Sequence, residues 1–88
     1  IVETAATDMD ILTDGTDKFV GGVNIGITNA AGKSFISGAS NDVLTMNGTT
    51  KGGLAGSVVI CTAMASAKYS IQGRILGSGT LVTPFADA

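Results

Sequence analysis

The feature that most constrains the fold is a strict alternation of apolar and polar residues near the C-terminal end. Tyr69, Ile71, Gly73 and Ile75 occupy every second position, and polar residues lie between them. This pattern predicts a strand with one face in a core and the other in water. Residues 57–64 are mainly apolar at both the odd and the even positions, which predicts a strand covered on both faces. Residues 65–67 then form a turn, so residues 57–76 are predicted to be a central hairpin.

The rest of the chain contains short runs of strand-forming residues separated by Gly, Asn and Asp. No stretch shows a sustained helical period. Turn signals at intervals of roughly 8–12 residues are typical of all-β sandwiches and barrels. The predicted fold class is therefore all-β, a small antiparallel β-sandwich or barrel with an extended N-terminal arm. The further predicted strands are residues 9–12, 18–28, 33–37, 42–46 and 80–83.

Four local signals refine this prediction. Gly21 and Gly22, in the middle of a predicted strand, indicate a bulge or a close backbone approach. Residues 29–32 are predicted to be a turn. Asn47 and Gly48 tolerate positive φ and are a strong hairpin signal, so they are predicted to close the fourth strand. Pro84 lacks a backbone donor and is predicted to end the last strand.

The composition indicates that the chain depends on association. A domain of 88 residues buries only about 60–65% of the surface that its unfolded form exposes. One Tyr, three Phe and no Trp make the core thin. Cys61 is the only cysteine, so no disulfide forms within one chain, and it is predicted to be a buried small hydrophobe. Because the chain has no histidine, a structural metal site is poorly supported. Contacts with other chains therefore remain as the expected source of additional stability.

Charge divides the chain into two unlike parts. Residues 1–17 hold five acidic residues and no basic one, while all Lys and Arg residues lie later. Residues 1–17 are interpreted as an acidic N-terminal arm or a first strand, and residues 18–88 as a single β domain. The net charge of −2 is weak and of the wrong sign for nucleic acid or an anionic membrane. No apolar run approaches the roughly 20 residues of a membrane-spanning helix, and no signal peptide is visible.

No residue set predicts a chemistry. The sequence Gly32-Lys33-Ser34 matches the last three positions of the phosphate-binding loop motif. The first glycine of that motif would, however, fall on Ile27. The acidic residues of the arm are spaced unlike an EF-hand, because Leu12 occupies a ligand position counted from Asp10. A loose calcium site at the surface, or a small enzyme that uses these carboxylates and a metal, stays open as a less favoured hypothesis. We predict no catalytic, cofactor-binding or metal-binding residues and no cofactor.

Residues 41–85 resemble the closing segments of structural proteins of tailed bacteriophages. The likeness consists of a turn-rich D-x-L-x-L-x-G type strand, a G-x-x-G-x-x-V type strand and an aromatic K-W-x-V-x-G type strand, in that order. Tyr69 stands where these proteins often have Trp. The matching segments are residues 41–50, 53–59, 68–73, 77–80 and 83–85.

The resemblance implies a non-enzymatic virion protein, most like a capsid decoration (cement) protein on the capsid exterior. It implies two partners, the major capsid protein and sister copies, usually as a homotrimer, with no nucleic acid and no membrane. A head-fibre or tail domain that adheres to a host surface or glycan is the alternative. The arm is expected to reach a neighbour, and tyrosine is enriched in subunit contacts. The candidate interface residues are Ile1, Val2, Glu3, Asp8, Asp10, Tyr69 and Phe85.

Overall fold

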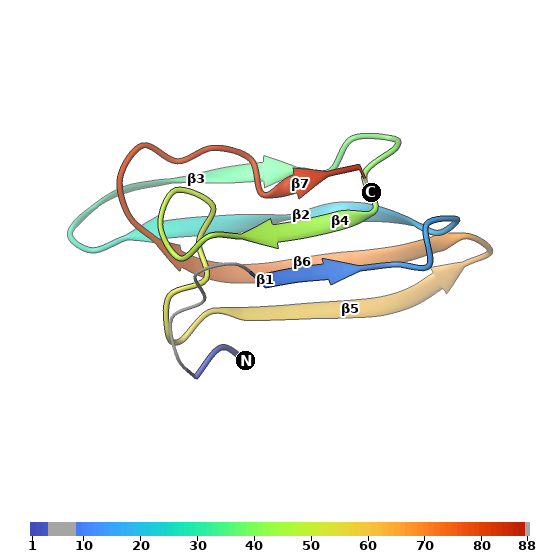
Figure 1. Ribbon diagram of the computed structural model, residues 1–88, viewed down its shortest axis with the longest axis horizontal. Helices are drawn as coiled ribbons and strands as arrows, with labels where there is room; N and C mark the ends of the chain where they lie inside the picture. The colour runs from blue at the N-terminus through green and yellow to red at the C-terminus, as the bar shows by residue number, and fades with distance from the viewer. Residues whose placement is uncertain (4–8, 88) are drawn as a thin grey trace.

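The computed structural model describes residues 1–3 and 9–87, and it shows two β-sheets packed face to face (Figure 1). A three-stranded sheet has the strand order β1-β4-β7, and a four-stranded sheet has the order β3-β2-β6-β5. The predicted all-β sandwich is confirmed. The strands are β1 Met9–Leu12, β2 Lys18–Ile27, β3 Ala30–Ile36, β4 Val43–Met46, β5 Val58–Ala65, β6 Lys68–Gly77 and β7 Phe85–Ala86.

The core lies between the two sheets and follows the predicted alternation. On β6, Ile71 and Ile75 are buried as predicted, and on β2, Val23 and Ile25 are buried on the same face. A side chain of this kind contributes about 1.5–3 kcal/mol when it is removed from water. The core cluster is Phe19, Val23, Ile25, Leu44, Met46, Ile71, Ile75, Leu81 and Phe85.

The two inner strands of the four-stranded sheet run parallel to each other, which differs from the antiparallel pairing predicted for the whole sandwich. β2 pairs with β6 over its whole length, from Lys18 opposite Lys68 to Ile27 opposite Gly77. The other strand pairs are antiparallel, as predicted for this fold class. The close backbone approach predicted at Gly21 and Gly22 is confirmed, because a Cβ atom on either residue would meet a backbone carbonyl oxygen of a neighbouring strand.

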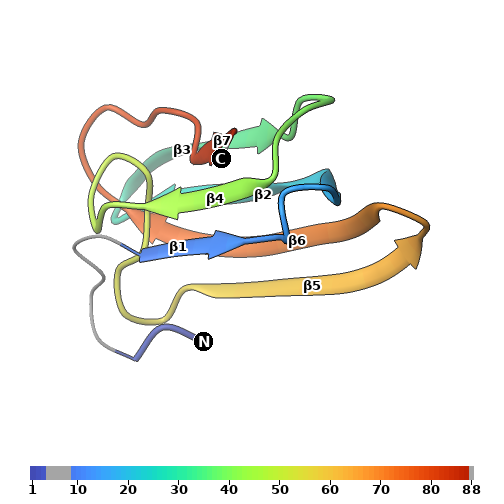
Figure 2. The same cartoon turned by 45° about the vertical axis from the view of Figure 1, so that its right-hand side comes forward.

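The predicted hairpin over residues 57–76 is present, but only one of its strands is central. β6 lies inside the sheet, whereas β5 forms its edge. The prediction that residues 57–64 are covered on both faces is wrong, because β5 is exposed from Ile60 to Ala65. Figures 1 and 2 show why the inner face of β5 is left open: β5 runs beyond the area that the three-stranded sheet covers. In the described part of the chain, no third sheet covers the outer face.

Several loop predictions require correction. The turn predicted at residues 29–32 is shorter, because β3 already begins at Ala30. Asn47 and Gly48 do turn, with φ +81 at Gly48, but they do not join two paired strands. Instead, the Asn47 side chain accepts hydrogen bonds from the N–H groups of Thr49 and Lys51, both at 2.9 Å, and this organises a wider loop.

The end of the chain also differs from the prediction. Residues 80–83 form no strand, and Pro84 precedes β7 rather than ending a strand. The Pro84 carbonyl accepts a hydrogen bond from the Thr45 N–H at 2.7 Å, which brings the chain into the three-stranded sheet.

An ion pair links β2 to the segment that enters β4. The Lys18 ammonium lies 3.1 Å from the Asp42 carboxylate, and the Asp42 side chain is almost fully buried. The Asp42 N–H also donates to the Ala86 carbonyl of β7 at 3.1 Å. Asp42 therefore ties both sheets together at one end. Among residues 1–3 and 9–87, no helix is long and apolar enough to cross a membrane.

Candidate functional site

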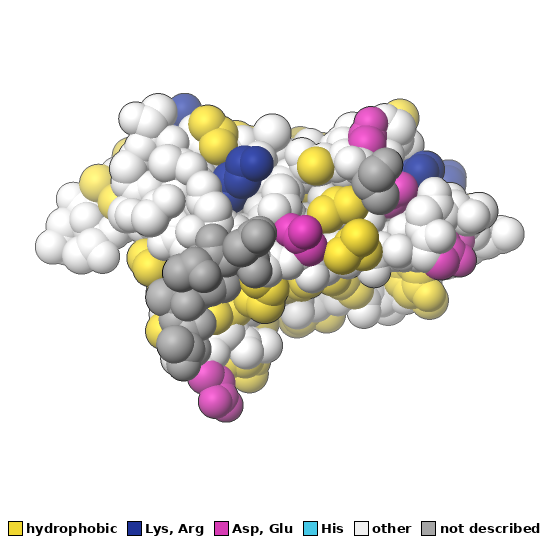
Figure 3. All heavy atoms as spheres, viewed as in Figure 1, with side chains coloured by type: hydrophobic (Ala, Val, Ile, Leu, Met, Phe, Trp, Pro, Cys, Tyr) yellow, Lys and Arg dark blue, Asp and Glu magenta, His cyan; other side chains and the backbone are white. Residues whose placement is uncertain are grey.

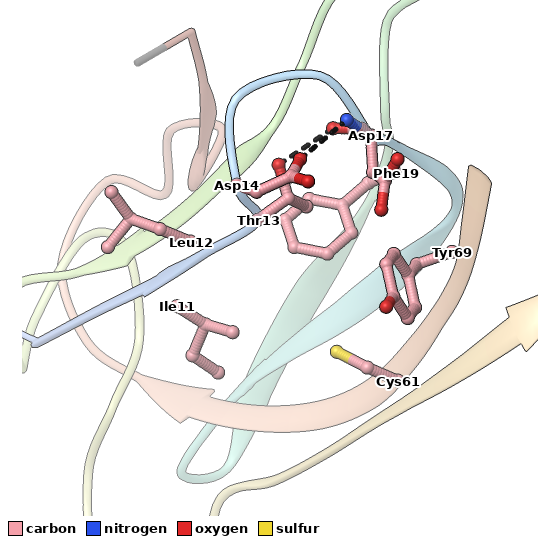
Figure 4. A pocket seen from close by; sticks show the side chains of 8 residues that line it. All are labelled: Ile11, Leu12, Thr13, Asp14, Asp17, Phe19, Cys61 and Tyr69. Atoms are coloured by element: carbon pink, nitrogen blue, oxygen red, sulfur yellow. Dashed lines mark hydrogen bonds between the residues drawn. The ribbon is translucent and has the colours of Figure 1, made fainter. Parts of the chain in front are cut away.

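A groove of about 260 Å³ opens where the three-stranded sheet leaves part of β5 and β6 uncovered (Figure 4). Its apolar walls come from both sheets, and its rim is the loop between β1 and β2. Because two elements far apart in sequence form the walls, the groove depends on the sandwich being assembled. The lining residues are Ile11, Leu12, Thr13, Asp14, Asp17, Phe19, Cys61 and Tyr69.

The acidic rim of the groove is explained by turn formation. The Asp14 carboxylate accepts hydrogen bonds from the N–H groups of Thr16 at 2.9 Å and Asp17 at 3.0 Å. These two bonds, Asp17 first, hold the pKa of Asp14 below its usual value of 3.8. The Thr13 hydroxyl donates to the Asp17 carbonyl at 2.7 Å and closes the same turn. The carboxylate of Asp14, one of those considered for the less favoured calcium site, therefore serves as an acceptor for backbone N–H groups.

This turn predicts a pH dependence. A carboxyl whose folded-state pKa is lowered stabilises the fold above its unfolded pKa, and this stabilisation is lost as the pH falls through the folded value. We expect Asp14→Ala to lower the unfolding midpoint at pH 7. The difference from the unmodified chain should shrink as the pH falls below about 3.8. Urea unfolding of the variant and of the unmodified chain, at pH 7 and at pH 3, measures the difference in unfolding midpoint at each pH. A difference that is the same at both pH values would contradict this account of the turn.

Cys61 and Tyr69 lie at the open side of the groove. The prediction that Cys61 is buried is wrong, because the residue is exposed. Partial covering by the groove raises the pKa of its thiol above the usual value of 9.0, so it is protonated at neutral pH and is a weak nucleophile. Tyr69 faces inward as predicted and packs, half-buried, against the core cluster.

The predicted interface residues fall in different environments. Ile1, Glu3 and Asp10 are exposed, while Asp8 lies outside the described residues. Val2 is buried and is held by the backbone: its N–H donates to the Ser57 carbonyl, and its carbonyl accepts from the Gly56 N–H, both at 2.8 Å. Phe85 belongs to the core, where its ring centroid lies 6.5 Å from that of Phe19. The structure does not bring these residues together as one patch.

The structure reveals an open sheet edge that the sequence pattern does not predict. Ile60 and Met64 on β5 are about half exposed, at 49% and 54%. Figure 3 shows hydrophobic side chains along the lower part of the molecule, between β1 and β5. The one signal for this edge in the sequence is the lack of any charged residue between Ser57 and Ala67, which fits a buried strand equally well.

The outer face of the four-stranded sheet has a second hollow. Amide and guanidinium groups are among the groups that line it. On this face the Ser34 hydroxyl donates to the Asn24 side-chain oxygen at 2.6 Å. The hollow measures about 500 Å³ and is lined by Gly22, Asn24, Gly56, Val58, Ile60, Gln72, Gly73 and Arg74.

Neither hollow gathers a set of residues with an obvious chemistry. Within residues 1–3 and 9–87, no group of three or more His, Cys, Asp or Glu side chains is placed to hold a metal ion. The chain as a whole has no histidine. Comparison with protein-family models, with curated proteins and with solved structures finds no match for the chain.

Proposed function

We propose that the chain is a non-enzymatic virion structural protein that decorates and stabilises a phage capsid. It binds the outer surface of the major capsid protein and associates with sister copies. The observation that carries the proposal is the open outer edge of β5. This uncharged strand pairs with β6 on one side, and among the described residues no strand pairs with it on the other side. The resemblance of residues 41–85 to phage structural proteins supplies the identity of the partner.

Three properties of the groove support a binding role rather than a catalytic one. Its thiol is held in the protonated form, its Asp14 carboxylate already accepts two backbone hydrogen bonds, and its walls are mainly apolar. Nucleophilic catalysis needs an activated nucleophile with a base in reach. An exposed apolar surface next to an open strand edge is instead typical of protein contacts.

The test is binding to capsid shells assembled from the major capsid protein of the same phage. We expect the chain to sediment with the shells and to raise the temperature at which they dissociate. A Glu3→Ala and Asp10→Ala double variant, which removes two exposed carboxylates, should bind roughly two- to thirtyfold more weakly, because each surface charge contributes about 0.2–1 kcal/mol. Its own unfolding midpoint should stay unchanged. Failure of the unmodified chain to bind or protect the shells would contradict the proposal.

An adhesive head-fibre or tail domain is the second candidate. The observation that favours it is the hollow on the outer sheet face, where Asn24, Gln72 and Arg74 offer hydrogen-bonding groups of the kind that bind sugar hydroxyls. The adhesive role would be favoured if the chain does not bind capsid shells but binds host cells, and if Gln72→Ala abolishes the binding to cells. Retained cell binding in Gln72→Ala would exclude this hollow as the binding site.

A further inference from the structure

β5 lacks the devices that usually prevent edge strands from pairing with other chains. Such edges are normally protected by Lys or Pro residues, by bulges, by short length or by a covering element. β5 is eight residues long, contains no Pro and no charged residue, and is exposed from Ile60 onward. Its one irregularity in register lies near its end, between Ala63 and Ala65. The opposite edge of the same sheet, β3, carries Lys33.

The same edge already accepts an added segment of chain. Val2 exchanges two backbone hydrogen bonds of 2.8 Å with Gly56 and Ser57, immediately before β5 begins. Val2 thus adds one short backbone pairing to this sheet edge, next to the start of β5. In the described part of the chain, no strand continues this pairing along Val58–Ala65.

We propose that β5 pairs in the antiparallel direction with β5 of a second copy of this chain, about a two-fold axis perpendicular to the sheet. The pairing joins two four-stranded sheets into one continuous sheet of eight strands. Two copies of an uncharged strand meet without like-charge repulsion, whereas an edge with Lys33 would place equal charges together if it paired with itself. Two-fold contacts of this kind are self-complementary and are the commonest in homo-oligomers. The inference rests on the self-association that the proposed function includes, and it puts a two-fold dimer in place of the homotrimer that the resemblance implies.

The side chains of β5 suit this pairing on both faces. Val59, Cys61 and Ala63 lie opposite Gly73, Ile71 and Tyr69 of β6 and so point toward the inner face. A perpendicular two-fold axis places this inner row beside the inner row of the partner, which closes the open side of the groove. On the outer face, Ile60 comes beside outer-face residues of the second copy and loses part of its exposure to water.

The symmetry also restricts the register. In a two-fold antiparallel pair, one residue lies opposite its own copy, because the pairing of each residue is repeated by the partner. The register centred on Cys61 places Val59 opposite Ala63 of the partner subunit and keeps most of the regular part of the strand paired. Directly opposite residues have Cβ atoms about 4.5–5.5 Å apart. The two Cys61 thiols then lie within reach of a short bismaleimide cross-linker.

The test is the association state of the isolated chain and of two matched variants. We expect sedimentation equilibrium to show a monomer–dimer equilibrium for the unmodified chain. Ile60→Lys should weaken dimerisation at least tenfold, because it places a charge beside the pairing edge. Ile36→Lys, the same substitution at an exposed residue of β3, should leave the dimer intact. Urea unfolding of both variants checks that each is folded.

Cross-linking through Cys61 provides an independent measurement. A short bismaleimide should join two unmodified chains covalently within the dimer, and Ile60→Lys should abolish the product. A chain that stays monomeric at millimolar concentration would overturn the pairing. A trimer that is lost in both Ile60→Lys and Ile36→Lys would also overturn it, in favour of a head-to-tail contact between β5 and β3. If a monomeric chain binds capsids, the β5 pairing is contradicted but the capsid role is not. If the chain dimerises but does not bind capsids, only the capsid role is contradicted.

Discussion

Replacing Ile75 with aspartate is expected to leave the chain unfolded at room temperature. Ile75 has no exposed surface, and its side chain packs against Gly52, where even an added Cβ atom would collide with it. A carboxylate at this position would be buried among apolar side chains, and burying an unpaired charge costs more than burying any neutral group. The whole stability of a domain of this size is about 4–13 kcal/mol at roughly 0.05–0.15 kcal/mol per residue. Circular dichroism and urea titration should therefore show no cooperative transition.

The matched control is Ile36→Asp, the same substitution at a residue of the same sheet that is 81% exposed. We expect this variant to unfold with a midpoint close to that of the unmodified chain, because surface substitutions usually change stability by less than about 0.5 kcal/mol. A folded Ile75→Asp variant would show that the inner and outer faces of β6 are reversed.

Leu44→Ala is expected to give a large loss of stability that still permits folding. Leu44 is completely buried on β4, the middle strand of the three-stranded sheet, and it pairs with Ile11 and Phe85. Removing a buried leucine side chain to alanine costs about 2–5 kcal/mol, because the lost burial is joined by the cost of the cavity. Urea unfolding should show a lower midpoint with an unchanged slope.

Leu12→Ala controls for the substitution itself. Leu12 lies on β1 of the same sheet and is 58% exposed, so we expect a loss well below 1 kcal/mol. Equal losses in Leu12→Ala and Leu44→Ala would mean that the three-stranded sheet does not cover the core.

The alternating strands are the part of the fold that the sequence predicts well. Its pattern predicts β1 to the residue, and it predicts β6 and β2 with the correct buried faces. These strands have one wet and one dry side, so their side chains indicate which face is which. The period-two spacing of residues such as Ile71 and Ile75 is therefore sufficient to assign them to the core.

The burial predicted for β5 is wrong because a run of apolar residues is compatible with two structural environments. Residues 57–64 are apolar on both faces, which is typical of a strand buried in a sheet, but it also suits an edge that is covered by another molecule. The choice depends on how far the second sheet extends, and that extent is a tertiary property. The exposure of Cys61, on the inner face, follows from the small size of the three-stranded sheet, whereas Ile60 is exposed because it lies on the outer face of its sheet.

Loop chemistry explains the other differences. The Asn47-Gly48 pair predicts a closed hairpin, yet the Asn47 side chain binds the backbone of its own loop. Short polar side chains compete in this way with strand pairing. The candidate interface residues are dispersed for a related reason, because composition indicates that the arm is acidic but not that Val2 is fixed at the end of β5.

The parallel contact between β2 and β6 also bears on how fast the protein acquires its structure. Lys18 pairs with Lys68, fifty positions later, and this separation is repeated along the whole contact. Closing such long loops costs entropy before any pairing energy is gained, so domains dominated by distant pairings fold in about milliseconds to seconds. During synthesis on the ribosome, β2 must therefore wait for the segment fifty positions later to emerge. Until β6 pairs with β2, the β2–β3 hairpin lacks the strand that covers its second edge.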